Sequence, residues 1–122
     1  MIDRRTLLVS GGAAAAALAS PAGAVTPLGR DDIVLGSPRA PVTVIEYASA
    51  SCPHCARWSM EVFPEFQRRF IRTGQVRYAL REFLTAPPEL AAAGFLLARC
   101  RGPSRYYDIL QAVFAAQAEV YR

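Results

Sequence analysis

Two cysteines, Cys52 and Cys55, lie between a run of strand-forming residues and the start of a helical pattern. The run Val42–Tyr47 is rich in β-branched residues and almost continuously apolar, which is typical of a strand buried on both faces of a parallel or mixed sheet. Pro53 follows Cys52 directly, and proline is favoured at the first position of a helix, where its missing N–H would have no partner. The order strand, Cys-x-x-Cys, helix therefore predicts an α/β fold with both cysteines at the start of a helix.

The residues after this motif complete a β-α-β unit. Apolar side chains at helical spacing form one stripe, made of Trp58, Val62, Phe63, Phe66 and Phe70. Pro64 should kink this helix, and Thr73-Gly74 should end it. Gln75–Phe83 then alternates apolar and polar residues and is predicted to be a strand parallel to the first. Asp32–Leu35 is a candidate for a short additional strand.

Two further helices are predicted after Thr85. The first opens at Pro87-Pro88, and its apolar stripe consists of Leu90, Ala93, Leu97 and Cys100. Gly102-Pro103 should break it, and Ser104 is a candidate N-cap for the second helix, whose apolar face consists of Tyr107, Leu110, Phe114 and Tyr121. Because free cysteine is among the most buried residue types, we expect Cys100 to pack in the core, with a regulatory or intermolecular disulfide as the alternative.

The first 24 residues have the pattern of an export signal. Arg4-Arg5 provides the positive start, Leu7–Ala19 is uncharged and too short to span a membrane, and Ala22-Gly23-Ala24 offers a cleavage site. The paired arginines also resemble a twin-arginine signal, with the general secretion route as the alternative. The mature chain from Val25 would then work outside the cytoplasm, without stable membrane insertion and in a compartment that permits disulfides.

The charge balance argues against a nucleic-acid partner. The 122 residues carry 14 basic and 10 acidic side chains, and the formal net charge is +4. Every basic residue is arginine, and these arginines are spread along the chain rather than gathered in a stripe with stacking aromatics. So small an excess of positive charge is common on the surface of a soluble globular domain and does not indicate a nucleic-acid partner.

The position predicted for Cys52 favours a reactive thiolate. As the N-cap, its sulfur would face the unpaired backbone N–H groups and the positive end of the helix dipole, and a protonated His54 would add positive charge. We therefore expect Cys52 to ionise below the ordinary thiol pKa of about 8.5. A thiol of low pKa is also a good leaving group, so a Cys52–Cys55 disulfide should readily oxidise other thiols, with Cys55 as the resolving thiol.

Two other roles for the cysteine pair are weaker. A purely structural disulfide that closes so short a loop would gain little entropy. A zinc site needs four ligands, and beyond the pair only His54 and Cys100 are candidates. We therefore expect neither a metal nor a cofactor.

Glu46 is the second informative residue, because it is a carboxylate in an otherwise apolar strand. A buried charge without a partner is costly, so its pKa should rise, and a carboxyl group of this kind near the thiols could exchange the proton of Cys55. The alternative is that Glu46 faces solvent or pairs with an arginine.

The chain resembles a known family, the DsbA-like thiol–disulfide oxidoreductases of bacterial envelopes. The residues that carry the resemblance are Ala40–Ser49, the motif Cys52-Pro53-His54-Cys55, Val62–Pro64, Arg81–Phe83 and Leu96–Cys100. The similarity covers most of the range from Asp31 to Gln117, and the Pro-His pair between the cysteines is fairly specific to the family.

The resemblance implies a fold, a site and partners. The fold would be a thioredoxin-like domain, begun by residues 25–84, with a helical domain inserted into it that starts in residues 85–122. Cys52 would be the nucleophile, Cys55 the resolving thiol and Glu46 the buried acid. From their place between the cysteines, Pro53 and His54 are also candidate site residues, Pro53 for starting the helix and His54 for tuning the thiol. Substrates would be reduced or unfolded exported proteins in the periplasm, and a quinone-linked membrane partner would reoxidise the cysteines.

The chain differs from the family pattern in one respect. The family continues beyond its inserted helices into a further helix, a β-hairpin preceded by a cis-proline loop, and a last helix, and no residue here matches that loop. We therefore expect this chain to correspond to the N-terminal part of such a protein and to fold poorly alone. The alternatives for function are a truncated, non-catalytic product and, within the enzyme class, a disulfide reductase or isomerase.

Overall fold

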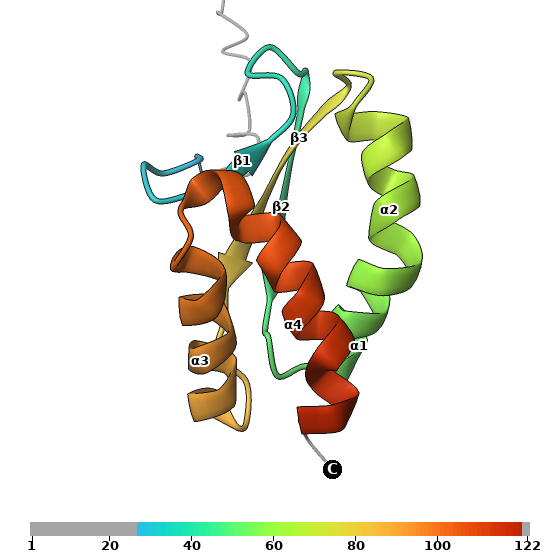
Figure 1. Ribbon diagram of the computed structural model, residues 1–122. Helices are drawn as coiled ribbons and strands as arrows, with labels where there is room; N and C mark the ends of the chain where they lie inside the picture. The colour runs from blue at the N-terminus through green and yellow to red at the C-terminus, as the bar shows by residue number, and fades with distance from the viewer. Residues whose placement is uncertain (1–26, 121–122) are drawn as a thin grey trace, which may run out of the picture.

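The computed structural model describes residues 27–120, which form a small mixed sheet covered by helices (Figure 1). The sheet has the order β1-β3-β2, with β1 at Val34–Leu35, β2 at Val42–Ala48 and β3 at Val76–Glu82. β2 and β3 are parallel, as the β-α-β prediction requires, and β1 is antiparallel to β3. The predicted export signal lies outside the described residues.

The central strand of this sheet is β3, and the prediction that Val42–Tyr47 is buried on both faces is wrong. Val42 is 50% exposed and Tyr47 is 60% exposed, because within the described residues β2 pairs only with β3. β3 has neighbours on both sides, so even Ala79, on the face that the alternation assigned to polar residues, is fully buried.

One helical run with two wide turns connects β2 to β3. It consists of α1 (Pro53–Arg57), the π-helical segment η1 (Trp58–Val62), α2 (Phe63–Phe66) and a second π-helical segment, η2 (Gln67–Ile71). The first wide turn ends just before Pro64, whose missing N–H cannot serve a regular turn. Each wide turn also changes which side its own residues and the next ones face, so Val62 and Phe70 are exposed, contrary to the predicted stripe, while Phe63 is buried.

The two later helices have the predicted positions, and the first of them buries a different face. The second buries Leu110 and Phe114 as predicted, and Tyr121 lies outside the described residues. α3 spans Pro88–Arg99, after a cis peptide bond between Ala86 and Pro87, and a short 3-10 turn, η3 (Pro103–Arg105), leads into α4 at Tyr106–Val120. The buried residues of α3 are Ala91, Gly94, Phe95 and Ala98 rather than Leu90, Leu97 and Cys100, which are exposed. Cys100 follows the last residue of α3, so its thiol lies outside the core, contrary to expectation.

α4 ties the helices together. It lies between α3 and the α1–α2 run (Figure 1) and contacts both. Its buried residues Tyr106, Leu110 and Phe114 join one core cluster with Phe63 and Tyr78. Within residues 27–120, no helix is long and apolar enough to cross a membrane.

Candidate functional site

Cys52 is the N-cap residue of α1, as the sequence predicts. Its backbone is extended, with φ −86° and ψ 119°, and Pro53 is the first helical residue. Its carbonyl accepts the first helical hydrogen bond, from the N–H of Ala56 at 3.1 Å, and its own N–H donates to the carbonyl of Ser49 at 3.1 Å. The side chain thus lies half-buried where a strand ends and a helix begins.

The two thiols of the motif have opposite electrostatic surroundings. Burial alone would raise the pKa of Cys52, but the backbone N–H of Cys55, the Cys55 thiol and the backbone N–H of His54 together lower it below the ordinary value. Burial raises the pKa of Cys55 to about 11, helped by the neighbouring Cys52 and by the charge of Glu46. Deprotonation therefore falls on Cys52 first.

The residues between the cysteines act mainly through the backbone. Pro53 and His54 are both exposed at the start of the helix. The contribution of His54 that the structure shows is its backbone N–H, which favours the Cys52 thiolate. Pro53 has no N–H and a φ suited to the first helical position, so it favours a helix start at this point, where the next N–H groups face the sulfur.

Glu46 lies near this thiol pair, and neither of the environments considered from sequence is correct. It is half-buried, and its Oε2 accepts hydrogen bonds from Nε1 of Trp58 at 2.8 Å and from the hydroxyl of Tyr78. The carboxylate is therefore neither an unpartnered buried charge nor the partner of an arginine. Its proximity to the motif is visible in its effect on Cys55, whose pKa it raises.

A cluster of hydrogen-bonded hydroxyl groups holds the loop between β2 and α1 in place. Oγ of Ser51 lies 3.0 Å from Oγ of Ser49 and 2.9 Å from Oγ1 of Thr85, and it donates to the Thr85 carbonyl at 3.0 Å. The N–H of Thr85 donates in turn to Oγ of Ser49 at 3.2 Å. Because both serines are buried, these bonds fix the backbone that precedes Cys52 to the segment after β3.

Sequence analysis missed one residue that contacts this loop, Gln117 on α4. It is only 6% exposed, and its side-chain amide donates to the carbonyls of Ala50 and Cys52. A signal was present, because Gln117 continues the helical spacing of Leu110 and Phe114 and so stands on a buried face. A glutamine at such a position indicates a specific hydrogen-bond partner.

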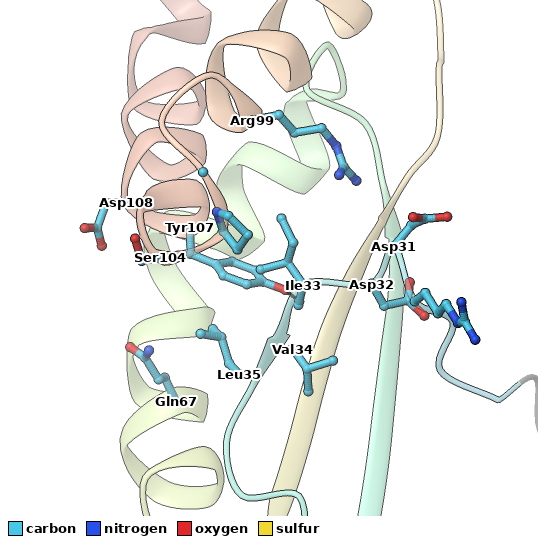
Figure 2. A pocket seen from close by; sticks show the side chains of 13 residues that line it. Asp31, Asp32, Ile33, Val34, Leu35, Gln67, Arg99, Ser104, Tyr107 and Asp108 are labelled. Atoms are coloured by element: carbon cyan, nitrogen blue, oxygen red, sulfur yellow. Dashed lines mark hydrogen bonds between the residues drawn. The ribbon is translucent and has the colours of Figure 1, made fainter.

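A cleft with a volume of about 660 Å³ lies apart from the cysteines. It is formed by the β1 region, η2 and the turn before α4, and Figure 2 shows Tyr107 in it beside Ile33. The Tyr107 hydroxyl donates to the Ile33 carbonyl at 2.6 Å, and Asp32 at its edge is paired with Arg81 at 2.7 Å. These contacts join β1 to the rest of the fold.

The described part of the chain contains no group of three or more His, Cys, Asp or Glu side chains arranged to hold a metal ion. Cys52 and Cys55 are not bonded to each other in this structure. The chemistry that this arrangement can perform is thiol–disulfide exchange, with one thiolate stabilised and its neighbour kept protonated.

Comparison with known proteins agrees with this arrangement. A family model described as Thioredoxin matches residues 29–122. A candidate protein-disulfide oxidoreductase of Rickettsia conorii is 37% identical over 89 residues, which are 73% of this chain and 31% of that protein. Disulfide bond formation protein D of Bacillus subtilis is 31% identical over 88 residues, which are 70% of this chain and 40% of that protein.

A solved structure is similar over the same region. The crystal structure of alpha-DsbA1 from Wolbachia pipientis matches with a TM-score of 0.68 and 33% identity, covering 75% of this chain and 45% of that one. The chain thus spans less than half the length of each of these relatives.

Proposed function

The chain belongs to the thioredoxin family, in its DsbA-like group of thiol–disulfide oxidoreductases, and on this basis we propose that Cys52 and Cys55 exchange a disulfide with the thiols of other proteins. The observation that carries the proposal is the opposite shift of the two thiols, with the pKa of Cys52 lowered and that of Cys55 raised to about 11. Such a pair has one good leaving group and one thiol that stays protonated until it is needed.

The first step is attack on the Cys52–Cys55 disulfide. A substrate thiolate attacks the sulfur of Cys52, a substrate–Cys52 disulfide forms, and the Cys52–Cys55 bond breaks. The electron pair of that bond goes to the Cys55 sulfur, which takes up a proton because its pKa lies well above neutral pH. We assign the delivery of that proton, and its removal in the reverse step, to Glu46, the carboxyl group whose charge acts on Cys55.

The second step releases the oxidised substrate. A second thiolate of the substrate attacks its own sulfur in the mixed disulfide, and Cys52 leaves as a thiolate that the N–H groups of His54 and Cys55 stabilise. The substrate has then lost two electrons and gained a disulfide, and the motif has gained two electrons as a dithiol. Stabilisation of the leaving thiolate favours this direction.

The substrates that fit are reduced or unfolded proteins exported to the periplasm. The sequence pattern of residues 1–24 supports export, and the resemblance to DsbA-like proteins supports a quinone-linked membrane partner that accepts the two electrons and restores the disulfide. Such a partner is required for turnover, because each substrate disulfide leaves the motif reduced.

The test is oxidation of a reduced, unfolded test protein by the oxidised chain. We expect substrate disulfides to form in proportion to the oxidised chain added. In the reverse direction, the Cys52 thiolate of Cys55→Ser should attack a disulfide of an oxidised test protein and remain trapped as a substrate–Cys52 mixed disulfide, because no resolving thiol is left. Cys52→Ser should abolish both the oxidation of reduced substrate and this trapping. Cys100→Ser is the matched control and should retain full activity, because Cys100 is exposed and lies outside the motif. Failure of Cys55→Ser to trap substrate would contradict the proposal.

A further inference from the structure

Gln117 links the far end of α4 to the two carbonyls that precede and follow Ser51. Its Nε2 donates to the Ala50 carbonyl at 2.8 Å and to the Cys52 carbonyl at 3.2 Å. A side-chain amide has two N–H donors, so both are committed to this loop. The contact joins residues that are 65 and 67 positions apart in sequence, so it depends on how α4 packs rather than on the loop itself.

A second contact shows how closely the helices approach the same loop. A Cβ atom on Gly94 of α3 would lie 2.8 Å from Cβ of Ala50 and 3.0 Å from Cγ1 of Val113 on α4. The absence of a side chain at Gly94 therefore lets α3 and the loop pack against each other, with α4 alongside. Ala50 is 1% exposed, so the loop is enclosed on this side by both helices.

From these contacts we propose that Gln117 is a positioning residue for Cys52, an inference that rests on the proposed function. The carbonyl of Cys52 accepts from both Gln117 and the N–H of Ala56, so the amide of Gln117 holds the N-cap residue in the orientation that begins α1. That orientation places the sulfur beside the free N–H groups of His54 and Cys55. The amide also reduces the negative partial charge of the Cys52 carbonyl, a charge that opposes a thiolate on the same residue.

Loss of this donation should weaken the thiolate rather than merely loosen the fold. Methionine has nearly the shape of glutamine but cannot donate, so Gln117→Met removes both hydrogen bonds while filling the space. We expect the pH at which Cys52 becomes reactive to rise by about half a pH unit. Because the reduced form loses thiolate stabilisation, the motif should also become about threefold less oxidising against glutathione at a pH above that inflection.

The experiment compares Cys52 alkylation against pH in the full chain and in three variants. Gln117→Met and Gln117→Glu should both raise the Cys52 inflection, the second because an acceptor and a negative charge replace the donor. Leu110→Ala is the control for stability, since it removes a buried side chain of the same helix and leaves both hydrogen bonds of Gln117 in place. It should lower the melting temperature and leave the inflection in place.

Three outcomes are decisive. An unchanged inflection in Gln117→Met, measured below its unfolding transition, overturns the proposal. An equal upward shift in Leu110→Ala also overturns it, because loosened packing would then explain the effect. A wild-type Cys52 inflection at the ordinary thiol value counts instead against the proposed function, while the difference between wild type and Gln117→Met still decides the role of Gln117.

Discussion

The hydroxyl of Tyr78 on β3 donates a hydrogen bond to Oε2 of Glu46 on the neighbouring parallel strand β2. Tyr78 is 2% exposed, and burial together with the charge of Glu46 raises its pKa far above the ordinary value, so its hydroxyl keeps its proton. The indole of Trp58 donates to the same oxygen at 2.8 Å. Two rigid aromatic donors therefore hold one oxygen of this carboxylate in place near the cysteine pair.

Glu46→Gln should leave attack by Cys52 nearly intact and slow resolution by Cys55. We propose that the Glu46 carboxylate takes the proton of Cys55 during resolution, which an amide cannot do. This loss should outweigh the lower Cys55 pKa that removal of the negative charge would bring. Mixed disulfides with a test substrate should accumulate on a non-reducing gel. Glu65→Gln, a charge change on the exposed side of the helical run, is the matched control. Unchanged resolution by Glu46→Gln across the pH range would remove this role.

Tyr78→Phe should lower the free energy of unfolding by about 1–3 kcal/mol at neutral pH, because it leaves a half-buried carboxylate with one donor fewer. The contribution of Tyr78 to stability should decrease at alkaline pH. The pKa of Tyr78 is higher in the folded chain than its ordinary value of about 10, so its contribution is complete below pH 10 and is lost as the pH rises above it. Urea unfolding at pH 7 and pH 11 measures both effects. The loss of stability between these two values should be smaller in the variant, and an equal loss would contradict the assignment.

Asp32→Asn should weaken the attachment of β1, because Asp32 pairs with Arg81 at 2.7 Å and its side chain is only 10% exposed. The hydrogen bond from Arg81 lowers the pKa of Asp32, so the pair stabilises the fold above the ordinary carboxyl pKa of about 3.9 and loses this effect as the pH falls further. The urea midpoint of the variant should lie below wild type at pH 7 and approach it at about pH 2. Glu65→Gln, whose partners are exposed, should scarcely move the midpoint at pH 7.

Gly94→Ala should destabilise the chain by about 1–3 kcal/mol, because the new methyl group would approach Cβ of Ala50 to 2.8 Å. The compensating change is Ala50→Gly, which removes the Cβ atom that the new methyl group would approach too closely. Thermal unfolding of the two single variants and the double variant forms a double-mutant cycle. The loss of unfolding free energy in the double variant should be smaller than the sum of the losses in the two single variants. Strict additivity would show that Gly94 and Ala50 are not in the close contact described.

Local signals explain what could be predicted from the sequence. The position of Cys52 at the N-cap, the start of the helix at Pro53 and the parallel pairing of the two long strands are confirmed, since each depends on adjacent residues or on one short connection. The strand at the centre was assigned wrongly, because the apolar character of Val42–Tyr47 carries no information on which strands lie beside it. Pairing of β1 with β3 is a long-range event.

Helix faces were harder to predict for a different reason. The wide turns at Trp58–Val62 and Gln67–Ile71 change the residue spacing within the helix, so an ideal period assigns Phe70 to the wrong side. In α3 the small residues Ala91 and Gly94 are buried while larger apolar ones are exposed, because close approach to the loop at Ala50 requires small side chains. Hydrophobicity alone does not reveal such a requirement.

The measurement that tests the central claim most directly is the rate of iodoacetamide labelling of each cysteine in the reduced chain against pH, resolved by mass spectrometry. The account predicts that Cys52 is labelled with an inflection below the ordinary thiol value of about 8.5, while labelling of Cys55 rises only toward a pH of about 11. Cys100, exposed and outside the motif, serves as the internal reference for reagent and accessibility. Equal inflections for Cys52 and Cys55 at the ordinary value would contradict the account.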